Sequence, residues 1–324
     1  MATGEQIKAL VKSHFENNSE RFSTTALQVA AHEARQGHEA LAKQIRDLVQ
    51  ASKSVSPTVS VIQFKREISD LILCKNSDSR LNDLILTEGL KSKLKRVLVE
   101  YRQQDKLKSF GLNNRRKLLL AGPPGTGKTL TAAVLAGELR LPLMTILMDK
   151  LITKYMGETS ARLRQIFETI QEHRGVYLFD EFDAIGADRC YDNDVGEMRR
   201  VLNSFLMFIE NDTSSSIIVS ATNNLKILDQ ALFRRFDDVL LYDRPRGNEI
   251  ERLIKNKLAS FLPSDFGLGA IVKDAEGLSH AEIGQACEDA LKDAILKDED
   301  KVTFEVLSHA IQDKRVAYNQ NWRE

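Results

Sequence analysis

The sequence predicts an α/β fold in which a parallel sheet is flanked by helices, with helical regions before and after it. Between about residue 80 and residue 245, short apolar runs alternate with helical patterns, which indicates a buried parallel sheet covered by helices. Apolar residues recur at helical spacing in residues 1–50 and again after Pro245, where no strand pattern separates the helices. These two stretches are therefore predicted to be helical regions of their own.

We expect three segments, because a chain of 324 residues exceeds the roughly 250 residues at which single cores stop growing. Residues 1–60 form an N-terminal helical module and linker, residues 61–245 the large α/β domain with its core from about residue 80, and residues 246–324 a small helical domain. The linker is assigned to Ser52–Thr58, which is rich in serine and contains a proline. The apolar stripes of the N-terminal helices are Ile7, Leu10, Val11 and Phe15, and then Leu41, Ile45, Leu48 and Val49.

Each element of the other two segments is predicted from its own pattern. The apolar runs that predict strands are Leu118–Leu120, Leu143–Met148, Val176–Phe179, Ile217–Ser220 and Val239–Tyr242. The amphipathic patterns that predict helices after Pro245 are Ile250–Leu258, Ile283–Ile295 and Phe304–Val316.

Composition excludes several classes of protein. Lys+Arg and Asp+Glu both number 46, so no net charge attracts the chain to nucleic acid or to an anionic membrane. Cys74, Cys190 and Cys287 are widely spaced, which argues against a disulfide framework or a zinc site. No apolar run reaches the roughly 18 residues that span a bilayer, and the N-terminus has no apolar signal core. We expect a cytoplasmic protein with free thiols and no membrane contact.

A phosphate-binding loop follows the first predicted strand of the sheet. The pattern Gly122-x4-Gly127-Lys128-Thr129 lies between the run Leu118–Leu120 and the helical pattern Leu130–Leu139, which is the context that distinguishes such a loop from an ordinary glycine-rich turn. Its backbone N–H groups and the helix N-terminus would bind phosphate. Lys128 would reach the β- and γ-phosphates of ATP, and the Thr129 hydroxyl would bind Mg²⁺. The predicted nucleotide-binding residues are Gly122, Pro123, Pro124, Gly125, Thr126, Gly127, Lys128, Thr129, Leu130 and Asp180.

Two acids follow the strand Val176–Phe179 directly. Asp180 and Glu181 lie at the carboxyl end of a strand, where α/β sheets bind their ligands. We expect Asp180 to hold Mg²⁺ with Thr129, and Glu181 to act as the base for the attacking water. Acids that merely end a strand are the alternative, which the phosphate loop disfavours.

Taken together, these motifs resemble those of the AAA ATPases of the AAA+ group. The resemblance covers about residues 80 to 315 and is greatest to members with a single ATPase cassette, such as katanin, spastin and the unfoldase partners of proteases. It implies ATP hydrolysis with Mg²⁺ in a ring, usually a hexamer, that acts on protein. The segments that carry it are GPPGTGKT, LFDEFDAIG, Val219-Ser-Ala-Thr-Asn223 and Leu232-Phe-Arg234-Arg235-Phe236-Asp237.

The resemblance assigns roles to several further residues. Asn223 matches the first sensor, which contacts the γ-phosphate or the attacking water, although a buried structural Asn is the alternative. Arg234 and Arg235 match the arginine fingers that reach a neighbouring subunit's nucleotide, although one of them could instead form an interface salt bridge.

Two segments match the loops that line the ring's pore. Lys154, Tyr155 and Met156 match the first pore loop, which grips a threaded polypeptide, and a Tyr155 packed within a helix is the alternative. Arg189-Cys190-Tyr191-Asp192 stands where the second pore loop is expected, with a less diagnostic sequence.

The sequence departs from the family at the second sensor, where many members have Ser-Gly-Ala-Asp and this chain has Ser279-His280-Ala281-Glu282. His280 either senses nucleotide or serves the helix start, and we favour the structural role because Ser279 is a good N-cap. Cys287 lies on an apolar stripe and is assigned to the core.

The expected function is remodelling, unfolding or disassembly of proteins by a ring that threads them through its pore, with residues 1–60 binding the client or partner. One alternative is an adaptor or signalling ring that binds a partner, such as a protease or an effector, without threading. A helicase or DNA-loading ATPase is disfavoured by the neutral charge and the lack of a basic, aromatic-rich patch. An inactive pseudoenzyme is disfavoured because every expected catalytic residue is present.

Overall fold

A computed structural model describes residues 25–27, 29–31, 33–34, 36–55, 66–152, 156–182, 195–224, 233–263 and 266–319. The chain divides into two compact units, Met1–Ile62 and Gln63–Glu324.

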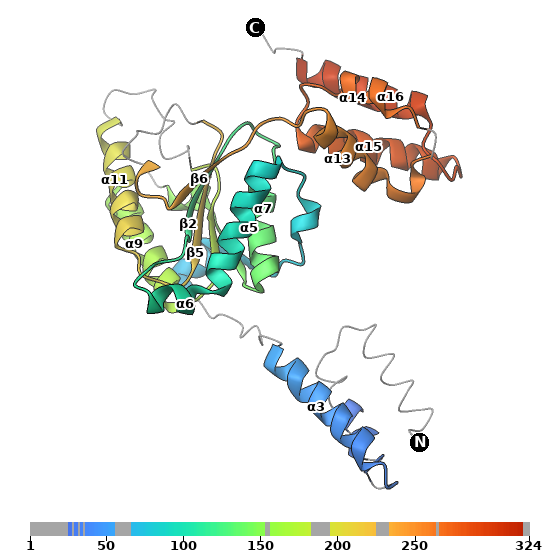
Figure 1. Cartoon of the computed structure of the whole chain (residues 1–324). Coiled ribbons are helices and arrows are strands. Elements are labelled where there is room, and N and C mark those ends of the chain that lie inside the picture. Colours follow the sequence, from blue (N-terminus) through green and yellow to red (C-terminus); the bar gives the residue numbers. More distant parts are fainter. Residues whose placement is uncertain are drawn as a thin grey trace. The chain divides into compact units, whose positions relative to one another are not determined.

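In the first unit, helix α3 (Glu39–Val55) contains the second predicted apolar stripe (Figure 1); the first stripe, Ile7 to Phe15, lies outside the described residues. Helix α3 also shows that the predicted linker begins too early, because Ser52–Val55 are helical. A serine within a helix costs only a small amount of free energy relative to alanine. A proline has a stronger effect, because it disfavours helical geometry in the residue before it. Helix α3 therefore continues through Ser52 and Ser54 as far as Val55.

The second unit contains a sheet whose strand order, within the described residues, is β1-β3-β4-β5-β2-β6. All five predicted strands are present and pair in parallel, but the one predicted over Leu143–Met148 ends at Ile146, because Met148 begins a short helix. The edge strand β1 pairs antiparallel with β3 and was not predicted, because it has four residues of which only the first is buried. The strands are β1 (Ile72–Lys75), β2 (Lys117–Ala121), β3 (Leu143–Ile146), β4 (Val176–Phe179), β5 (Ile217–Thr222) and β6 (Asp238–Leu241).

Helices cover both faces of this sheet, as Figure 1 shows. Alternate residues of β4 face opposite ways: Leu178 packs with helices α5 (Glu88–Arg102) and α7 (Lys128–Leu139), whereas Phe179 contacts aromatic rings of α9 (Met156–Glu172) and α11 (Val195–Asn211). Both faces are buried, which explains why the strands read as continuous apolar runs. The shorter elements are α4 (Arg66–Ser69), η1 (Leu81–Asp83), α6 (Gln104–Ser109) and α8 (Met148–Leu151).

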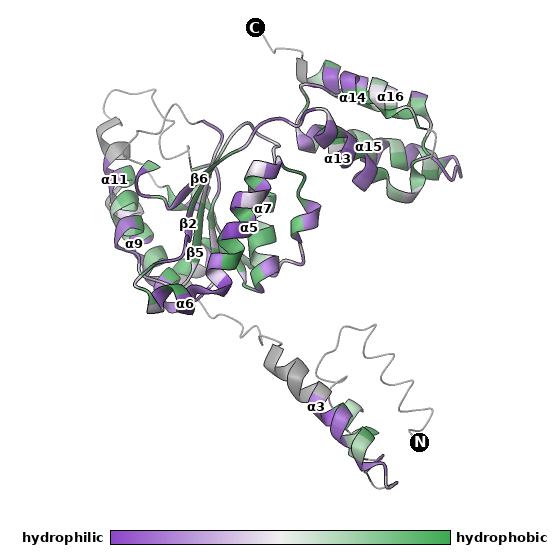
Figure 2. Cartoon of the chain, in the orientation of Figure 1, coloured by the Kyte–Doolittle hydropathy of each residue, from purple (hydrophilic) through white to green (hydrophobic). Residues whose placement is uncertain are grey.

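After the sheet, the chain is helical and has its own apolar core. Figure 2 shows hydrophilic and hydrophobic residues interspersed along these helices, as expected for amphipathic helices. Cys287 is fully buried in this core together with Ile283 and Ala286, which confirms its predicted place. No helix in the described part of the chain is long and apolar enough to cross a membrane. The elements are α13 (Asn248–Leu258), η3 (Ala259–Phe261), α14 (Leu268–Asp274), α15 (His280–Leu296) and α16 (Phe304–Asn319).

Candidate active site

The phosphate loop, Gly122–Gly127, connects β2 to α7 and is tightly packed. A Cβ atom on Gly122 would lie 2.3 Å from the Tyr242 carbonyl oxygen, and one on Gly125 would lie 2.6 Å from Ser279 Oγ. Both distances are far shorter than any real Cβ contact, and Gly125 also has a φ of +72°, which disfavours other residues. The two glycines therefore let the loop backbone lie against the segment after β6 and the start of α15.

Lys128 places a buried positive charge inside the loop. Its Nζ atom donates hydrogen bonds to the carbonyl oxygens of Gly122 and Pro123, each at 2.8 Å. Thr126 Oγ1 donates to the same Pro123 oxygen at 2.8 Å. The ammonium group is thus held beside the N-terminus of α7, where backbone N–H groups and the helix dipole favour an anion.

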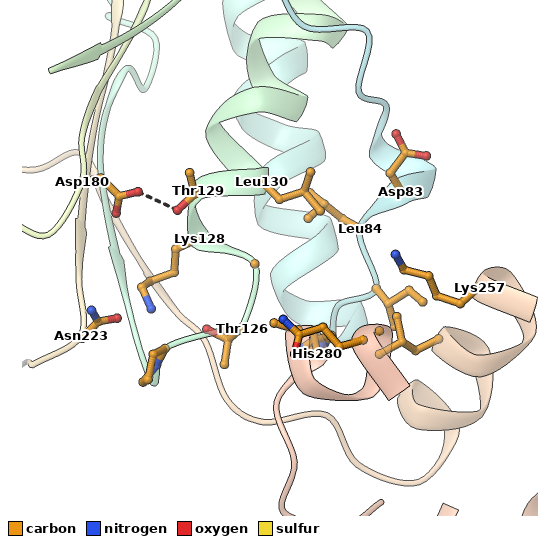
Figure 3. Close-up of a pocket in the computed structure, with 18 of the residues that line it drawn as sticks. Asp83, Leu84, Thr126, Lys128, Thr129, Leu130, Asp180, Asn223, Lys257 and His280 are labelled. Carbon is orange, nitrogen blue, oxygen red and sulfur yellow. Dashed lines mark hydrogen bonds between the residues drawn. The ribbon is translucent and has the colours of Figure 1, made fainter. Parts of the chain in front are cut away.

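Thr129 and Asp180 form the candidate magnesium site. Thr129 Oγ1, in the first turn of α7, donates a hydrogen bond of 2.7 Å to Oδ2 of Asp180, which directly follows β4 (Figure 3). The described residues contain no cluster of three or more His, Cys, Asp and Glu side chains that could hold a metal. Mg²⁺ does not need one, since it typically takes one or two carboxylates together with substrate phosphates. The hydroxyl and carboxylate oxygens therefore fit Mg²⁺ bound with a nucleotide.

Glu181 has an unusual backbone conformation, with a φ of +51°. It is held between two anchored neighbours: its N–H donates to Asp180 Oδ1 at 3.0 Å, and the buried Phe182 donates its N–H to the Ala221 carbonyl at 2.9 Å. A left-handed conformation costs a residue such as Glu about 1–2 kcal/mol, and such strain is concentrated at functional sites. The backbone of Glu181 is thus held directly after β4, and its exposed side chain lines the same cavity as Asp180.

These groups line one cavity of about 560 Å³, a size typical of small-molecule sites. We call the part formed by the loop and the strand ends the phosphate end; it contains Gly125–Thr129, Asp180, Glu181 and Asn223, which directly follows β5. We call the opposite part the lid end. Its residues were mostly missed from the sequence, because no motif marks them. They are Asp83, Leu84, Ile85, Leu253, Lys257, His280, Ala281, Gly284, Gln285 and Glu288.

The start of α15 contacts the phosphate loop directly. Ser279 Oγ accepts a hydrogen bond from the Glu282 N–H, and the Glu282 side chain accepts one from the Ser279 N–H, which forms a capping box. This confirms Ser279 as the N-cap and makes His280 the first helical residue. The Ala281 N–H donates to the Gly125 carbonyl at 3.0 Å. The helical region is thereby linked to the loop that would hold phosphate.

The remaining predicted residues lie away from this cavity or outside the described residues. Arg235 forms an ion pair with Glu210 of α11, and Arg234 is exposed; neither lines the cavity. Met156 is the first residue of α9. The structure does not describe Lys154, Tyr155 or the segment from Arg189 to Asp192.

Comparisons with known proteins agree with this geometry. The family model "ATPase family associated with various cellular activities (AAA)" matches residues 118–244. An uncharacterized AAA family ATPase of Sinorhizobium fredii is 34% identical over 322 residues, which are 97% of this chain and 96% of the relative.

Two further relatives are matched over only part of their length. A putative 26S proteasome regulatory subunit homolog of Methanothermobacter thermautotrophicus is 30% identical over 207 residues, 62% of this chain and 56% of the relative. The ATP-dependent zinc metalloprotease FtsH of Rhodothermus marinus is 34% identical over 203 residues, 60% of this chain and 29% of the relative. On the near full-length match to the Sinorhizobium protein and the matching family model, this chain belongs to the AAA family of ATPases.

Proposed function

We propose that this chain binds ATP with Mg²⁺ in the cavity, hydrolyses it, and uses the energy in a ring, most often a hexamer in this family, to remodel protein substrates. The observation that carries the proposal is the phosphate end itself. There the Lys128 ammonium, the Thr129–Asp180 pair and the strained Glu181 lie along one edge of the sheet. The AAA family implies ATP hydrolysis, and these are the side chains that the reaction needs.

Each side chain has a distinct role in this proposal. Lys128 neutralises charge on the β- and γ-phosphates, and Mg²⁺ held by Thr129 and Asp180 would supply further charge neutralisation when bound. Glu181 orients a water molecule and accepts its proton, since its carboxylate is exposed at the cavity. Asn223, at the end of the neighbouring strand, can donate from its amide to the γ-phosphate or to this water.

The ring supplies the group that one chain lacks. Among the residues that the structure describes, no arginine of the chain itself lines the cavity, although a guanidinium that stabilises the transferring phosphoryl group is typical of this chemistry. Arg234 and Arg235 are exposed and would reach the cavity of the neighbouring subunit. Arg235 would then exchange its ion pair with Glu210 for the neighbour's nucleotide, an exchange that is inexpensive because exposed ion pairs contribute little. AAA proteins typically oligomerise, which agrees with this role.

The substrate is proposed to be protein because two relatives are a proteasome regulatory subunit homolog and a protease. We assign the grip on a threaded polypeptide to Lys154, Tyr155 and Met156, by their resemblance to a pore loop. Residues 1–60 would select the client or partner, and residues 246–324 would act as a lid on the nucleotide, because the start of α15 contacts the phosphate loop.

The experiment first captures the client by purifying the Glu181→Gln protein with ATP and identifying what is retained. Wild type, Tyr155→Ala and the matched Tyr155→Phe variant are then compared on that client. Tyr155→Ala should keep basal ATP hydrolysis but lose processing of the client, whereas Tyr155→Phe should keep both because the aromatic ring remains. Normal processing by Tyr155→Ala would instead support a ring that binds a partner without threading it.

A further inference from the structure

Tyr242, directly after β6, contacts the first residue of the phosphate loop through its main chain. Its N–H donates to the carbonyl oxygen of Ala121, the last residue of β2, at 2.7 Å. Its own carbonyl oxygen would lie 2.3 Å from a Cβ atom on Gly122, so only glycine allows so close an approach. The main chain of Tyr242 therefore packs directly against the start of the loop.

The side chain of Tyr242 reaches the other end of the loop through a second hydroxyl group. Its phenolic oxygen lies 2.6 Å from Oγ1 of Thr131, in the first turn of α7. Thr131 Oγ1 in turn donates to the carbonyl oxygen of Gly127, the last residue of the loop, at 3.0 Å. A threonine hydroxyl has a single hydrogen, so in this series of bonds the Tyr242 hydroxyl is the donor to Thr131.

The Gly127 carbonyl belongs to the same peptide group as the Lys128 N–H. A peptide group is planar and its N–H points away from its carbonyl, so a fixed carbonyl oxygen also fixes the direction of that N–H. The Gly127 oxygen accepts from both the N–H and the hydroxyl of Thr131. The Lys128 N–H lies at the N-terminus of α7, where backbone N–H groups bind phosphate.

Both hydroxyl groups lie inside the protein. Thr131 is fully buried and Tyr242 is 5% exposed, and neither is among the described residues that line the cavity. Burial raises the pKa of Tyr242, so its hydroxyl keeps the hydrogen that it donates. Two buried hydroxyls that only satisfied each other would stabilise the fold without affecting a nucleotide. This series of bonds, in contrast, ends on the phosphate loop.

We propose that Tyr242 is a positioning residue for ATP: its main chain holds the start of the phosphate loop, and its hydroxyl, acting through Thr131, holds the end of the loop in the geometry that binds phosphate. The inference rests on the proposed ATP-binding function and adds a residue that does not touch the nucleotide. Without the hydroxyl, the peptide between Gly127 and Lys128 would have to be ordered when the nucleotide binds, which reduces affinity.

The test measures binding of ADP to the full chain by isothermal titration calorimetry, since ADP is not consumed. Tyr242→Phe keeps the ring but loses the hydroxyl, and it should weaken ADP binding about fivefold, the effect of one hydrogen bond. Thr131→Val also loses the bond to Gly127 and should weaken ADP binding at least as much. Adding Tyr242→Phe to Thr131→Val should cause no further loss, because the two side chains act through one series of bonds.

Two matched variants separate positioning from a general loss of stability. Thr131→Ser retains the hydroxyl and should bind ADP as the wild type does. Tyr177→Phe removes the hydroxyl of another buried tyrosine of the same sheet, which donates to the His173 carbonyl at 2.7 Å. Tyr177 is not among the described residues that line the cavity. Tyr177→Phe should lower the free energy of unfolding, as Tyr242→Phe does, but leave ADP binding unchanged.

Three results would overturn the inference: unchanged ADP binding in Tyr242→Phe, ADP binding in Thr131→Ser as weak as in Thr131→Val, or equal weakening in Tyr177→Phe. Thermal unfolding checks that each variant is folded, and if Tyr242→Phe does not fold, the comparison of Thr131→Val with Thr131→Ser decides in its place. Lys128→Ala separates the two proposals. If it abolishes ADP binding while Tyr242→Phe binds ADP normally, the proposed function stands and the positioning role is refuted. If the wild type binds no ADP, both are refuted.

Discussion

The phosphate end and the lid end of the cavity are built in different ways. At the phosphate end, the side chains follow β2, β4 and β5, which are neighbours in one sheet. Their relative positions are therefore fixed by the hydrogen bonds between strands. At the lid end, the residues come from the segment 83–85, from α13 and from α15, which are far apart in sequence and are brought together only by packing.

The difference implies that hydrogen bonds between strands position the phosphate end, whereas the geometry of the lid end depends on how α13 and α15 pack. The helices α13 to α16 share an apolar core that is separate from the core around β2. Ile85 packs into this second core although it precedes α5. The bond from the Ala281 N–H to the Gly125 carbonyl joins the two ends. We expect variants at the phosphate end to change chemistry by large factors, and variants at the lid end to change affinity and stability more modestly.

The largest expected effect tests whether the phosphate end is complete within one chain. Arg235→Ala should bind ATP normally but lose hydrolysis by a factor on the order of 10³, because the neighbouring subunit's phosphate loses its guanidinium. Steady-state ATP hydrolysis measures the loss. Glu210→Ala is the matched control: it breaks the same ion pair and should leave hydrolysis near wild type.

Mixing makes this prediction sharper. Arg235→Ala and Glu181→Gln subunits, each inactive alone, should regain part of the activity together, since some sites combine an intact base with an intact arginine. Mixed rings that are present by mass measurement yet inactive would contradict a role for Arg235 in the neighbour's site.

The next effect concerns the phosphate end itself. Lys128→Ala should weaken ATP binding by at least about 100-fold, because it removes a charge-assisted contact to several phosphate charges. Nucleotide titration measures this, with the exposed Lys93→Ala as control. Wild-type affinity in Lys128→Ala would show that nucleotide does not bind in this loop.

The smallest effect belongs to the lid end. Ser279→Ala removes an N-cap hydrogen bond and should lower the free energy of unfolding by about 1 kcal/mol. Denaturant unfolding measures it against Ser260→Ala, an exposed serine in the same helical region, which should have little effect. If Ser279→Ala did not lower the free energy of unfolding, or if Ser260→Ala lowered it as much, the N-cap at Ser279 would have no specific role in stabilising the helical region.

The same contrast explains how much the sequence could predict. The strands and the residues of the phosphate end were predictable, because a glycine-rich loop after one apolar strand and two acids after another lie within short, recognisable segments. Strand β1 was missed because one short edge strand with a single buried residue leaves no pattern. Leu84 and Lys257 were missed because only the packing of distant helices brings them to the cavity, and no local spacing encodes that.

Glu181 is proposed to be the catalytic base for ATP hydrolysis, and one measurement tests this role most directly. ATP binding and ATP turnover are determined on the same preparations of wild type, Glu181→Gln and, as control, the exposed Glu168→Gln on α9. Glu181→Gln should bind ATP as wild type does but turn it over roughly 10² times more slowly or worse, because an amide cannot accept the proton of water. Turnover near that of wild type in Glu181→Gln would contradict the assignment and place the catalytic base elsewhere.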